Sequence, residues 1–271
     1  MSFGPAITSK TNERVKVLRA SFAGKASKPG ELTGLEGEHL IAEALRSGLQ
    51  FEAVYVRRGS ELILDRPALR GLKAGQTVLL SEEVFDSAVG TETPQGIAAT
   101  LAIPAEKNLR ESALDLVLVL EAVRDPGNLG TLLRSAEAFG ASQVMMTPDC
   151  ANPWNPKVMR ASAGSVFRIA MLRARLSEMQ QRLAAGGVRV FAAVVSGQRV
   201  VSLLETDLRG RSALMIGNEG SGLSAEATKL ADVLLTIPCK TESLNAAVAG
   251  STLLYEAMRQ RAGAETRGGK S

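Results

Sequence analysis

Short amphipathic segments alternate with short apolar runs in the first hundred residues of this chain. Apolar residues spaced three and four apart predict helices over residues 8–21, 38–48 and 82–89. Runs of apolar residues predict strands over residues 51–56, 77–80 and 97–103. The Gly-, Lys- and Ser-rich stretch 22–37 is predicted to be a mobile loop. The pattern indicates a small α/β unit with its own core.

The pattern changes after a charged polar linker at residues 104–113. Continuous apolar runs then predict strands over residues 114–120, 143–146, 166–170, 188–195, 213–216 and 233–237. Amphipathic segments predict helices over residues 129–139, 156–163, 176–184 and 243–258. Apolar strands separated by helices are typical of a parallel sheet covered on both faces. We therefore expect an α/β protein with domains at residues 1–104 and 113–262, and a disordered Gly-rich tail over 262–271.

Small and polar residues gather where the last two predicted strands end. The strand at 213–216 runs directly into Gly217-Asn218-Glu219-Gly220-Ser221-Gly222, and three glycines in six residues let a ligand approach the backbone. The strand at 233–237 stops at Pro238, and the next helix opens near Ser243. Open α/β sheets bind ligands where strand ends and helix N-termini meet, so we expect a ligand site here.

Three motifs in this half of the chain resemble a known family. The first reads EAVRDPGNLG at residues 121–130 and continues as RSA at 134–136. The second is NEGSGL at 218–223, and the third joins IP, ESLN and LYEAMRQR over 237–261. Together they resemble the SpoU (TrmH-type) RNA ribose 2′-O-methyltransferases of the SPOUT superfamily. The Pro94-Gln95-Gly96 turn supports the resemblance, although a simple Pro-Gly turn would look the same.

The resemblance implies an N-terminal L30e-like substrate-binding domain and a C-terminal α/β methyltransferase domain with a trefoil knot. General topology rules would not have suggested a knot. It also implies S-adenosylmethionine as cofactor, a ribose 2′-OH of structured RNA as acceptor, and a homodimer. The N-terminal domain favours 23S ribosomal RNA over transfer RNA. A tRNA 2′-O-methyltransferase, or a non-catalytic RNA-binding or ribosome-assembly factor with the same fold, is the alternative.

The resemblance also assigns roles to individual residues. The expected catalytic residues are Asn128, Arg134, Glu219, Ser243 and Asn245. The expected cofactor-binding residues, which act mainly through backbone groups, are Ala193, Gly217, Asn218, Gly220, Ile237, Leu244 and Ala246. The chain departs from the family at residues 237–245, where its loop is two residues shorter than the usual I-P-M-x-G-x-x-x-S-L-N and lacks the glycine. This departure is the feature that favours the non-catalytic alternative.

Arg134 is the residue on which the chemistry depends most. An arginine pKa of roughly 12.5–13.8 argues against a free base. We expect its guanidinium to hold the target phosphate and stabilise the developing alkoxide, while Ser243 or a substrate phosphate relays the proton. Glu219 is expected to pair with Arg134. The structural alternatives are a surface salt bridge from Arg134 to Glu137 or Glu121, and a plain helix N-cap for Ser243.

Composition narrows the remaining choices. The chain carries a net charge of +4, and residues 1–30 hold six Lys or Arg against Glu13 alone, so Lys10, Arg14, Lys16 and Arg19 are expected to bind RNA rather than DNA. The alternative is a solvated basic helix face. A single histidine, His39, and two distant cysteines make a metal site or Ser-His triad improbable. With no secretory signal or membrane-spanning run expected, we predict a cytoplasmic protein. A G-x-G-x-x-G dehydrogenase motif is absent.

Overall fold

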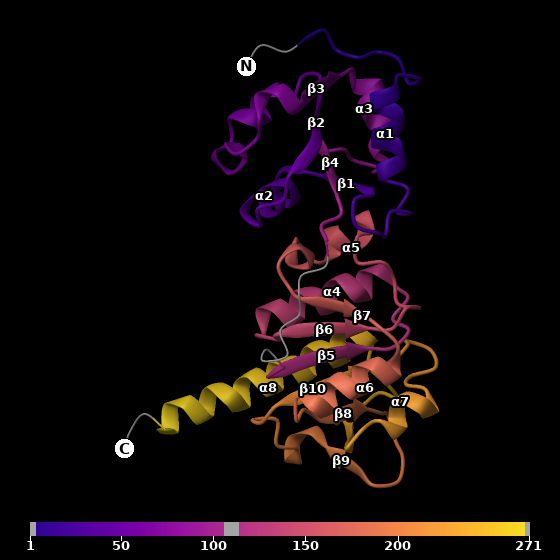
Figure 1. The fold of residues 1–271 in the computed structure, drawn as a ribbon, viewed down its shortest axis with the longest axis vertical. Coiled ribbons are helices and arrows are strands. Elements are labelled where there is room, and N and C mark those ends of the chain that lie inside the picture. The colour runs from indigo at the N-terminus through magenta and orange to yellow at the C-terminus, as the bar shows by residue number, and fades with distance from the viewer. Residues whose placement is uncertain (1–3, 106–113, 269–271) are drawn as a thin grey trace. The chain divides into compact units, whose positions relative to one another are not determined.

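The computed structural model describes residues 4–105 and 114–268 (Figure 1). By their internal contacts the residues form two compact units. The first unit comprises Met1–Ala105 together with Asn152–Arg168, and the second comprises Glu106–Ala151 together with Ile169–Ser271. The domain bounds expected from the sequence stay a prediction. The main difference concerns residues 152–168, which fall in the second predicted domain but make their contacts within the first unit.

The first unit is built on a four-stranded sheet with the order β1-β4-β2-β3. Its strands are β1 (Leu32–Glu36), β2 (Phe51–Arg57), β3 (Thr77–Leu80) and β4 (Ile97–Ala102). Its helices are α1 (Glu13–Ser21), α2 (Glu38–Arg46), α3 (Glu82–Val89) and α5 (Pro156–Ala161), with short 3-10 turns at Glu61–Asp65, Pro67–Leu69, Ala74–Gln76 and Ser165–Phe167. Only β2 and β3 pair in parallel among these strands. One core cluster joins α1 and α3 to the sheet through buried Val15, Leu18, Tyr55 and Phe85.

Strand β1 was not predicted, because the sequence reads as a loop there. It pairs antiparallel with β4 over its whole length, and Glu36 in it is buried. Gly34 in its middle is needed for packing, since a Cβ at that position would lie 2.8 Å from the Phe22 ring and from Ser21 Oγ. Gly34 and Glu36 are untypical of a strand, and tertiary contacts explain both of them here. The local sequence pattern therefore suggested a loop. The prediction of a mobile loop over 32–36 is wrong.

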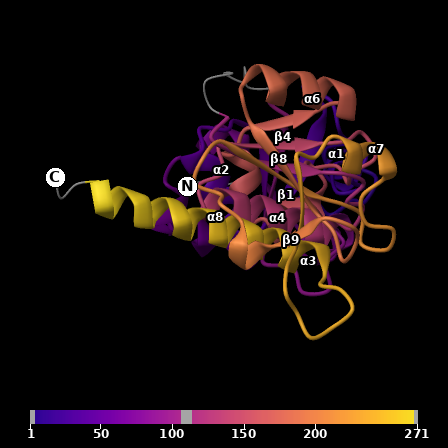
Figure 2. The same cartoon turned by 90° about the horizontal axis from the view of Figure 1, so that it is seen from below.

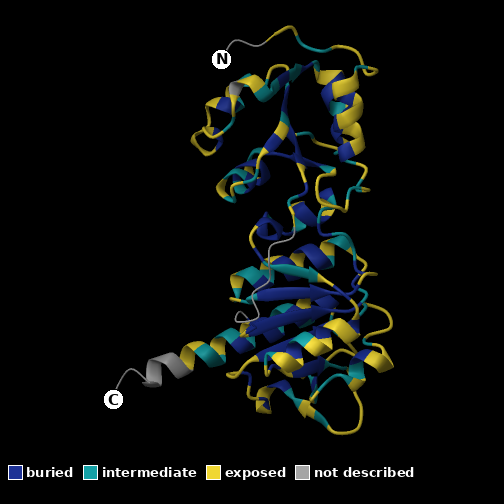
Figure 3. Cartoon of the chain, in the orientation of Figure 1, coloured by how far each residue is buried: buried dark blue, intermediate teal, exposed yellow. Residues whose placement is uncertain are grey.

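The second unit contains a seven-stranded parallel sheet with the order β7-β6-β5-β10-β8-β11-β9. Its strands are β5 (Leu116–Leu120), β6 (Gln143–Met146), β7 (Met171–Arg173), β8 (Arg189–Ala193), β9 (Val200–Ser202), β10 (Ser212–Ile216) and β11 (Val233–Thr236). Its helices are α4 (Pro126–Ala138), α6 (Leu176–Ala185), α7 (Ala225–Lys229) and α8 (Ala246–Gly268), with a 3-10 turn at Leu203–Glu205. Every residue of β5 and β10 is buried, as the dark central strands in Figure 3 show. The predicted parallel α/β sheet is confirmed.

Two predictions in this unit are wrong. The strand expected over 166–170 is the 3-10 turn Ser165–Phe167, and the strand that follows is β7. Val166 and Phe167 are buried, so their apolar pattern reports burial rather than strand geometry. The tail expected to be disordered from residue 262 is helical through Gly268, and residues 269–271 lie outside the described part of the chain.

Helix α8 packs by its N-terminal part on α4 and β10, and its remaining turns extend past the sheet of this unit (Figures 1 and 2). Gly250 allows the close approach, because a Cβ there would lie 2.3 Å from Leu132 Cδ2. This packing fixes where α8 begins, which matters for the site described next. Over residues 4–105 and 114–268, no helix combines the length and apolar character that a membrane crossing requires.

Candidate functional site

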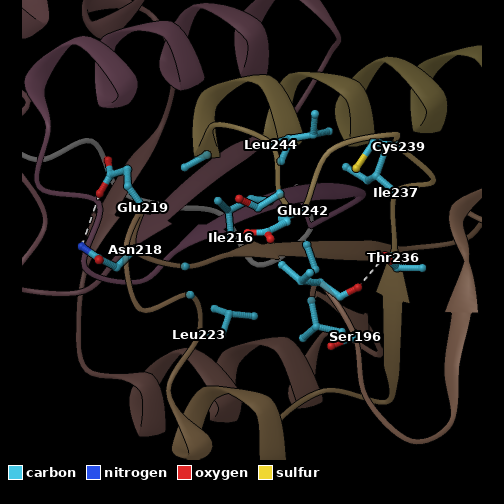
Figure 4. Close-up of a pocket in the computed structure, with 18 of the residues that line it drawn as sticks. Ser196, Ile216, Asn218, Glu219, Leu223, Thr236, Ile237, Cys239, Glu242 and Leu244 are labelled. Atoms are coloured by element: carbon cyan, nitrogen blue, oxygen red, sulfur yellow. Dashed lines mark hydrogen bonds between the residues drawn. The ribbon is translucent and has the colours of Figure 1, made fainter.

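The carboxyl ends of three neighbouring strands, β10, β8 and β11, open into a pocket of about 590 Å³ (Figure 4). The lining comes from the segments that follow these strands, at residues 193–196, 216–223 and 236–239. Residues 241–244 and two alanines of α8, Ala246 and Ala249, complete it. All the residues expected to bind cofactor lie in this lining: Ala193, Gly217, Asn218, Gly220, Ile237, Leu244 and Ala246.

The Gly-rich loop after β10 is held closed by its own backbone. The amides and carbonyls of Asn218 and Gly222 pair in both directions, at 3.0 and 2.9 Å. Gly217 has no room for a side chain, because a Cβ would lie 2.3 Å from the carbonyl carbon of Gly222. The Asn218 side chain accepts hydrogen bonds from the amides of Gly220 and Ser221, at 2.9 and 3.1 Å. The loop therefore presents a fixed backbone surface to the pocket.

A chain of side-chain hydrogen bonds joins the three sequence motifs. Asn245 Nδ2 donates to Asn128 Oδ1 at 3.1 Å, and Asn128 Nδ2 donates to Glu219 Oε1 at 2.9 Å. The second oxygen of Glu219 accepts from Asn218 Nδ2 at 3.3 Å, the contact drawn as a dashed line in Figure 4. Asn218 Nδ2 also donates to the carbonyl of Ala122 at 2.9 Å. Residues more than ninety positions apart thus converge on one edge of the pocket.

Asn245 also caps α8. Its Oδ1 accepts from the amides of Ala247 and Val248, at 2.9 and 3.3 Å. The helix therefore begins at Ala246, and the alternative role of Ser243 as N-cap is wrong. Ser243 lies in the pocket lining and is exposed, and its carbonyl accepts from Thr241 Oγ1 at 3.1 Å.

Arg134 is exposed on α4. The helix is positioned by Asp125, whose side chain accepts from the Asn128 amide at 2.8 Å, and by Pro126 in its first turn. Within residues 4–105 and 114–268, Arg134 makes no ion pair. The expected pairing with Glu219 is wrong, because the carboxylate is taken by the amides of Asn128 and Asn218. No ion pair joins Arg134 to Glu121 or Glu137 in the described part of the chain. The guanidinium is available to a ligand.

Sequence reasoning missed three residues around the pocket. Buried Glu121 accepts from the amide and hydroxyl of Ser224, at 2.8 and 2.6 Å, and so ties the end of β5 to α7. Ala122 takes a φ of 53°, a strained value for a residue with a Cβ, next to the loop that it anchors. Glu242 lies in the pocket lining, near the middle of the side chains in Figure 4. Only tertiary contacts distinguish these residues from ordinary loop positions.

The four basic residues expected to bind RNA are exposed on or next to α1. Lys10 pairs with Glu83 at 2.6 Å and Lys16 pairs with Glu13 at 2.7 Å. Arg19 Nη2 lies 3.5 Å from Ser87 Oγ, and Arg14 is exposed. Carboxylates therefore neutralise part of this surface. No group of three or more possible metal ligands occurs among the described residues.

Comparison with known proteins places the chain in a family. The model of the SpoU rRNA Methylase family matches residues 115–255, and the model for RNA 2′-O ribose methyltransferase substrate binding matches residues 35–106. The chain belongs to the SpoU rRNA methylase family. It thus has an N-terminal substrate-binding domain and a C-terminal SpoU methyltransferase domain, which confirms the fold class and the resemblance inferred from the motifs.

Named relatives of this SpoU family member are full-length matches. The chain is 35% identical to the Bacillus subtilis (strain 168) 23S rRNA (guanosine(2553)-2′-O)-methyltransferase RlmP, over 92% of this chain and 97% of that protein. An rRNA methyltransferase from Sinorhizobium meliloti has a TM-score of 0.80 at 29% identity, covering 94% of this chain and 97% of that one. The AdoMet-bound form of a Sinorhizobium meliloti rRNA methyltransferase has a TM-score of 0.78 at 27% identity. The match covers 94% of this chain and 97% of that one.

Proposed function

We propose that this protein transfers a methyl group from S-adenosylmethionine to a ribose 2′-OH of structured RNA, with 23S rRNA as the substrate. One observation carries the proposal: the hydrogen-bonded chain from Asn245 through Asn128 to Glu219 brings the three family motifs to one pocket. The named activity of the Bacillus subtilis relative and the substrate-binding match at residues 35–106 support ribosomal RNA as the substrate class.

The pocket lining suits this cofactor. Its volume of about 590 Å³ falls in the range of small-molecule sites. Small and apolar residues such as Ala193, Leu223 and Leu244 line most of it and leave backbone groups accessible to an adenine edge. The charged side chains among the lining residues are both acidic, Glu219 and Glu242. Such a lining favours a cationic sulfonium and disfavours a phosphate-bearing dinucleotide.

The chemistry follows from the placement of these residues. When bound, S-adenosylmethionine would supply an activated methyl group on a positively charged sulfur. The chain's own task is to hold the ribose in line with that group, and good positioning can contribute about 7–11 kcal/mol. Arg134 would grip the target phosphate and stabilise negative charge as the 2′-oxygen loses its proton. Ser243, a residue of the pocket lining, would relay that proton from the 2′-oxygen to solvent, unless a substrate phosphate takes it directly.

Dimerisation and cytoplasmic location are part of the proposal. Val248 and Tyr255 lie seven positions apart on α8 and are 52% and 50% exposed. Large apolar side chains at this spacing share one helix face, which a second copy of the chain would cover. The knotted topology and the L30e-like identity of the N-terminal domain are likewise inferred from family membership. The basic residues Lys10, Arg14, Lys16 and Arg19 are proposed to contact RNA.

The test is transfer of labelled methyl from S-adenosylmethionine to in vitro-transcribed 23S rRNA. We expect labelling at a linkage that then resists alkaline hydrolysis, since methylation removes the 2′-OH. Arg134→Ala should lower the rate by at least about 100-fold, as expected on losing a transition-state contact. Arg134→Lys should recover little, because lysine lacks the planar fork. Alkali-sensitive labelling, or near-wild-type turnover by Arg134→Lys, would overturn the proposal.

A further inference from the structure

A second group of basic residues lies on the first unit, away from α1. The loop between α1 and β1 carries Lys25 and Lys28, and helix α5 carries Lys157 and Arg160. All four side chains are exposed. We call Lys25, Lys28, Lys157 and Arg160 the two-segment basic patch, because its members come from segments about 130 positions apart.

Direct contacts hold the two segments together. Asn152 Nδ2 donates to the carbonyl of Ala26 at 2.5 Å, and Thr33 Oγ1 donates to the carbonyl of Trp154 at 2.8 Å. At Gly24 a Cβ would lie 2.6 Å from Asn155 Nδ2, and the φ of this glycine is +69°, so the loop passes closely over the start of α5. Lys25 therefore follows directly on a residue that touches Asn155, the N-cap of α5.

The α5 residues of the patch share one helix face. Lys157 and Arg160 are three positions apart, which brings their side chains to the same side of the helix. The intervening Val158 and Met159 are buried and fix the orientation of that face. The opposite side of α5 packs toward β1. The cationic face is thus held rigidly by the fold of the first unit.

The patch is less neutralised than the basic surface of α1. A carboxylate beside it, Glu31, accepts from the amides of Ser27 and Lys28, at 2.7 and 3.0 Å, and its charge also acts on Lys28. In the described ranges, none of the four patch residues makes an ion pair, whereas Lys10 and Lys16 are paired with glutamates. Cations without carboxylate partners are free to neutralise phosphates, and this neutralisation releases the counterions condensed on the RNA.

We propose that the two-segment basic patch binds the phosphate backbone of the RNA substrate and positions it for methylation. This inference rests on the proposed function and adds a surface to it. Half of the patch lies inside the stretch matched by the methylase model, yet it is built into the substrate-binding unit. The chain enters that segment at Ala151, whose amide donates to the carbonyl of Val123 in the first motif at 2.8 Å.

The chain contains its own reporter for this surface. Trp154 is the sole tryptophan of the sequence. It lies just before α5 in residues 152–168, the stretch grouped with the first unit, which we call the inserted segment. It is half-buried and stacks on Phe167 with ring centroids 6.2 Å apart. Its fluorescence should change when RNA occupies the neighbouring patch, and no other tryptophan contributes to the signal.

The experiment measures binding of in vitro-transcribed 23S rRNA across a salt series, with Trp154 fluorescence as a second readout. The variants are Lys157→Gln/Arg160→Gln and, from the other segment, Lys25→Gln/Lys28→Gln. Each should reduce the magnitude of the slope of log K against log salt by about 1 per charge removed. Each should weaken binding about 10-fold near 0.15 M salt and raise the RNA KM while kcat stays close to wild type. Arg70→Gln/Lys73→Gln removes two exposed charges elsewhere on the same unit and serves as the matched control.

The outcomes separate this inference from the proposed function. Loss of affinity in both patch variants with an unchanged control supports the patch. Unchanged slopes in folded patch variants, or an equal loss in the control, overturn it, as does failure of the wild type to bind the transcript. Patch-dependent binding without methyl transfer would support the patch while the proposed function fails. A drop in kcat without a change in RNA affinity would overturn the positioning role.

Discussion

At the scale of single residues, the side chains of the site are held in place by asparagine amides rather than by ion pairs. Asn128 is both acceptor and donor, so it links Asn245 to Glu219 and leaves Arg134 unpaired in the described part of the chain. Because Asn128 and Asn218 hold the Glu219 carboxylate, this carboxylate keeps its position without an ion pair to the guanidinium of Arg134. The motif residues were predictable from the sequence because each motif is local. Their partners were not, since the choice between Asn128 and Arg134 as partner of Glu219 is made by packing.

Asn245 offers a way to separate the cap from the hydrogen-bond chain. Asn245→Ala should lose both, with about 0.5–2 kcal/mol of stability removed by loss of the cap. Asn245→Asp keeps the capping oxygen but removes the donor to Asn128. We therefore expect wild-type thermal stability but strongly reduced methyl transfer for Asn245→Asp. Equal activity of Asn245→Asp and the wild type would show that the contact with Asn128 is dispensable.

At the scale of elements, strands and helices with a clear apolar period were predicted well. Elements shaped by their neighbours were not. Strand β1 carries Gly34 because Phe22 and Ser21 leave no room there. Helix α8 begins at Ala246 because Asn245 caps it, and the side chain of Asn245 also reaches Asn128. Neither constraint is visible in a local pattern. Likewise nothing in the sequence near residue 160 indicates that α5 packs on β1.

One ion-pair group anchors the inserted segment to α2. Arg168 Nη1 donates to Glu43 Oε2 at 2.5 Å, and Arg46 binds the other oxygen of this carboxylate. Burial of Glu43 raises its pKa, but the hydrogen bonds from Arg46 and Arg168 outweigh burial, and the pKa is lowered from 4.5. A lowered pKa contributes stability above the unfolded value, and this contribution is lost as the pH falls through the folded value.

Glu43→Gln should therefore destabilise the first unit by about 1 kcal/mol at pH 7. The difference from wild type should shrink as the pH falls below about 4. Urea unfolding followed by Trp154 fluorescence measures this, because Trp154 lies in the anchored segment. Glu13→Gln, which removes an exposed pair with Lys16, is the control and should change little. A difference that persists unchanged at pH 3 would contradict the assignment.

At the scale of the whole molecule, the chain builds its two units from interleaved segments. The sequence indicated two α/β parts and a boundary near residues 104–113, whereas by internal contacts residues 152–168 belong to the first unit. The order of strands and helices along the chain is the same whichever unit α5 packs in. The apolar periodicity therefore could not show that residues 152–168 belong to the first unit by contacts. The contacts of Asn152, Trp154 and Arg168 with the first hundred residues decide it.

A fragment of residues 1–105 should accordingly be incomplete. It lacks α5 and the bonds to Ala26, Thr33 and Glu43. We expect a fragment that joins residues 152–168 to 1–105 through a short Gly-Ser linker to be more stable by at least about 2 kcal/mol, because it recovers buried apolar side chains such as Val158 and Met159. Chemical denaturation of both fragments, followed by circular dichroism, makes the comparison. Equal stability would mean that the segment is not part of this unit.

The central claim is that the pocket between β10, β8 and β11 is the cofactor site, and calorimetric titration with S-adenosylmethionine tests it most directly. We predict one bound cofactor per chain for the wild type. Ala193→Leu places extra volume in the lining and should weaken binding at least about 10-fold, an effect of roughly 1.4 kcal/mol. Ala225→Leu, at an exposed position of α7, should bind like the wild type. Tight binding by Ala193→Leu, or no binding by the wild type, would contradict the account.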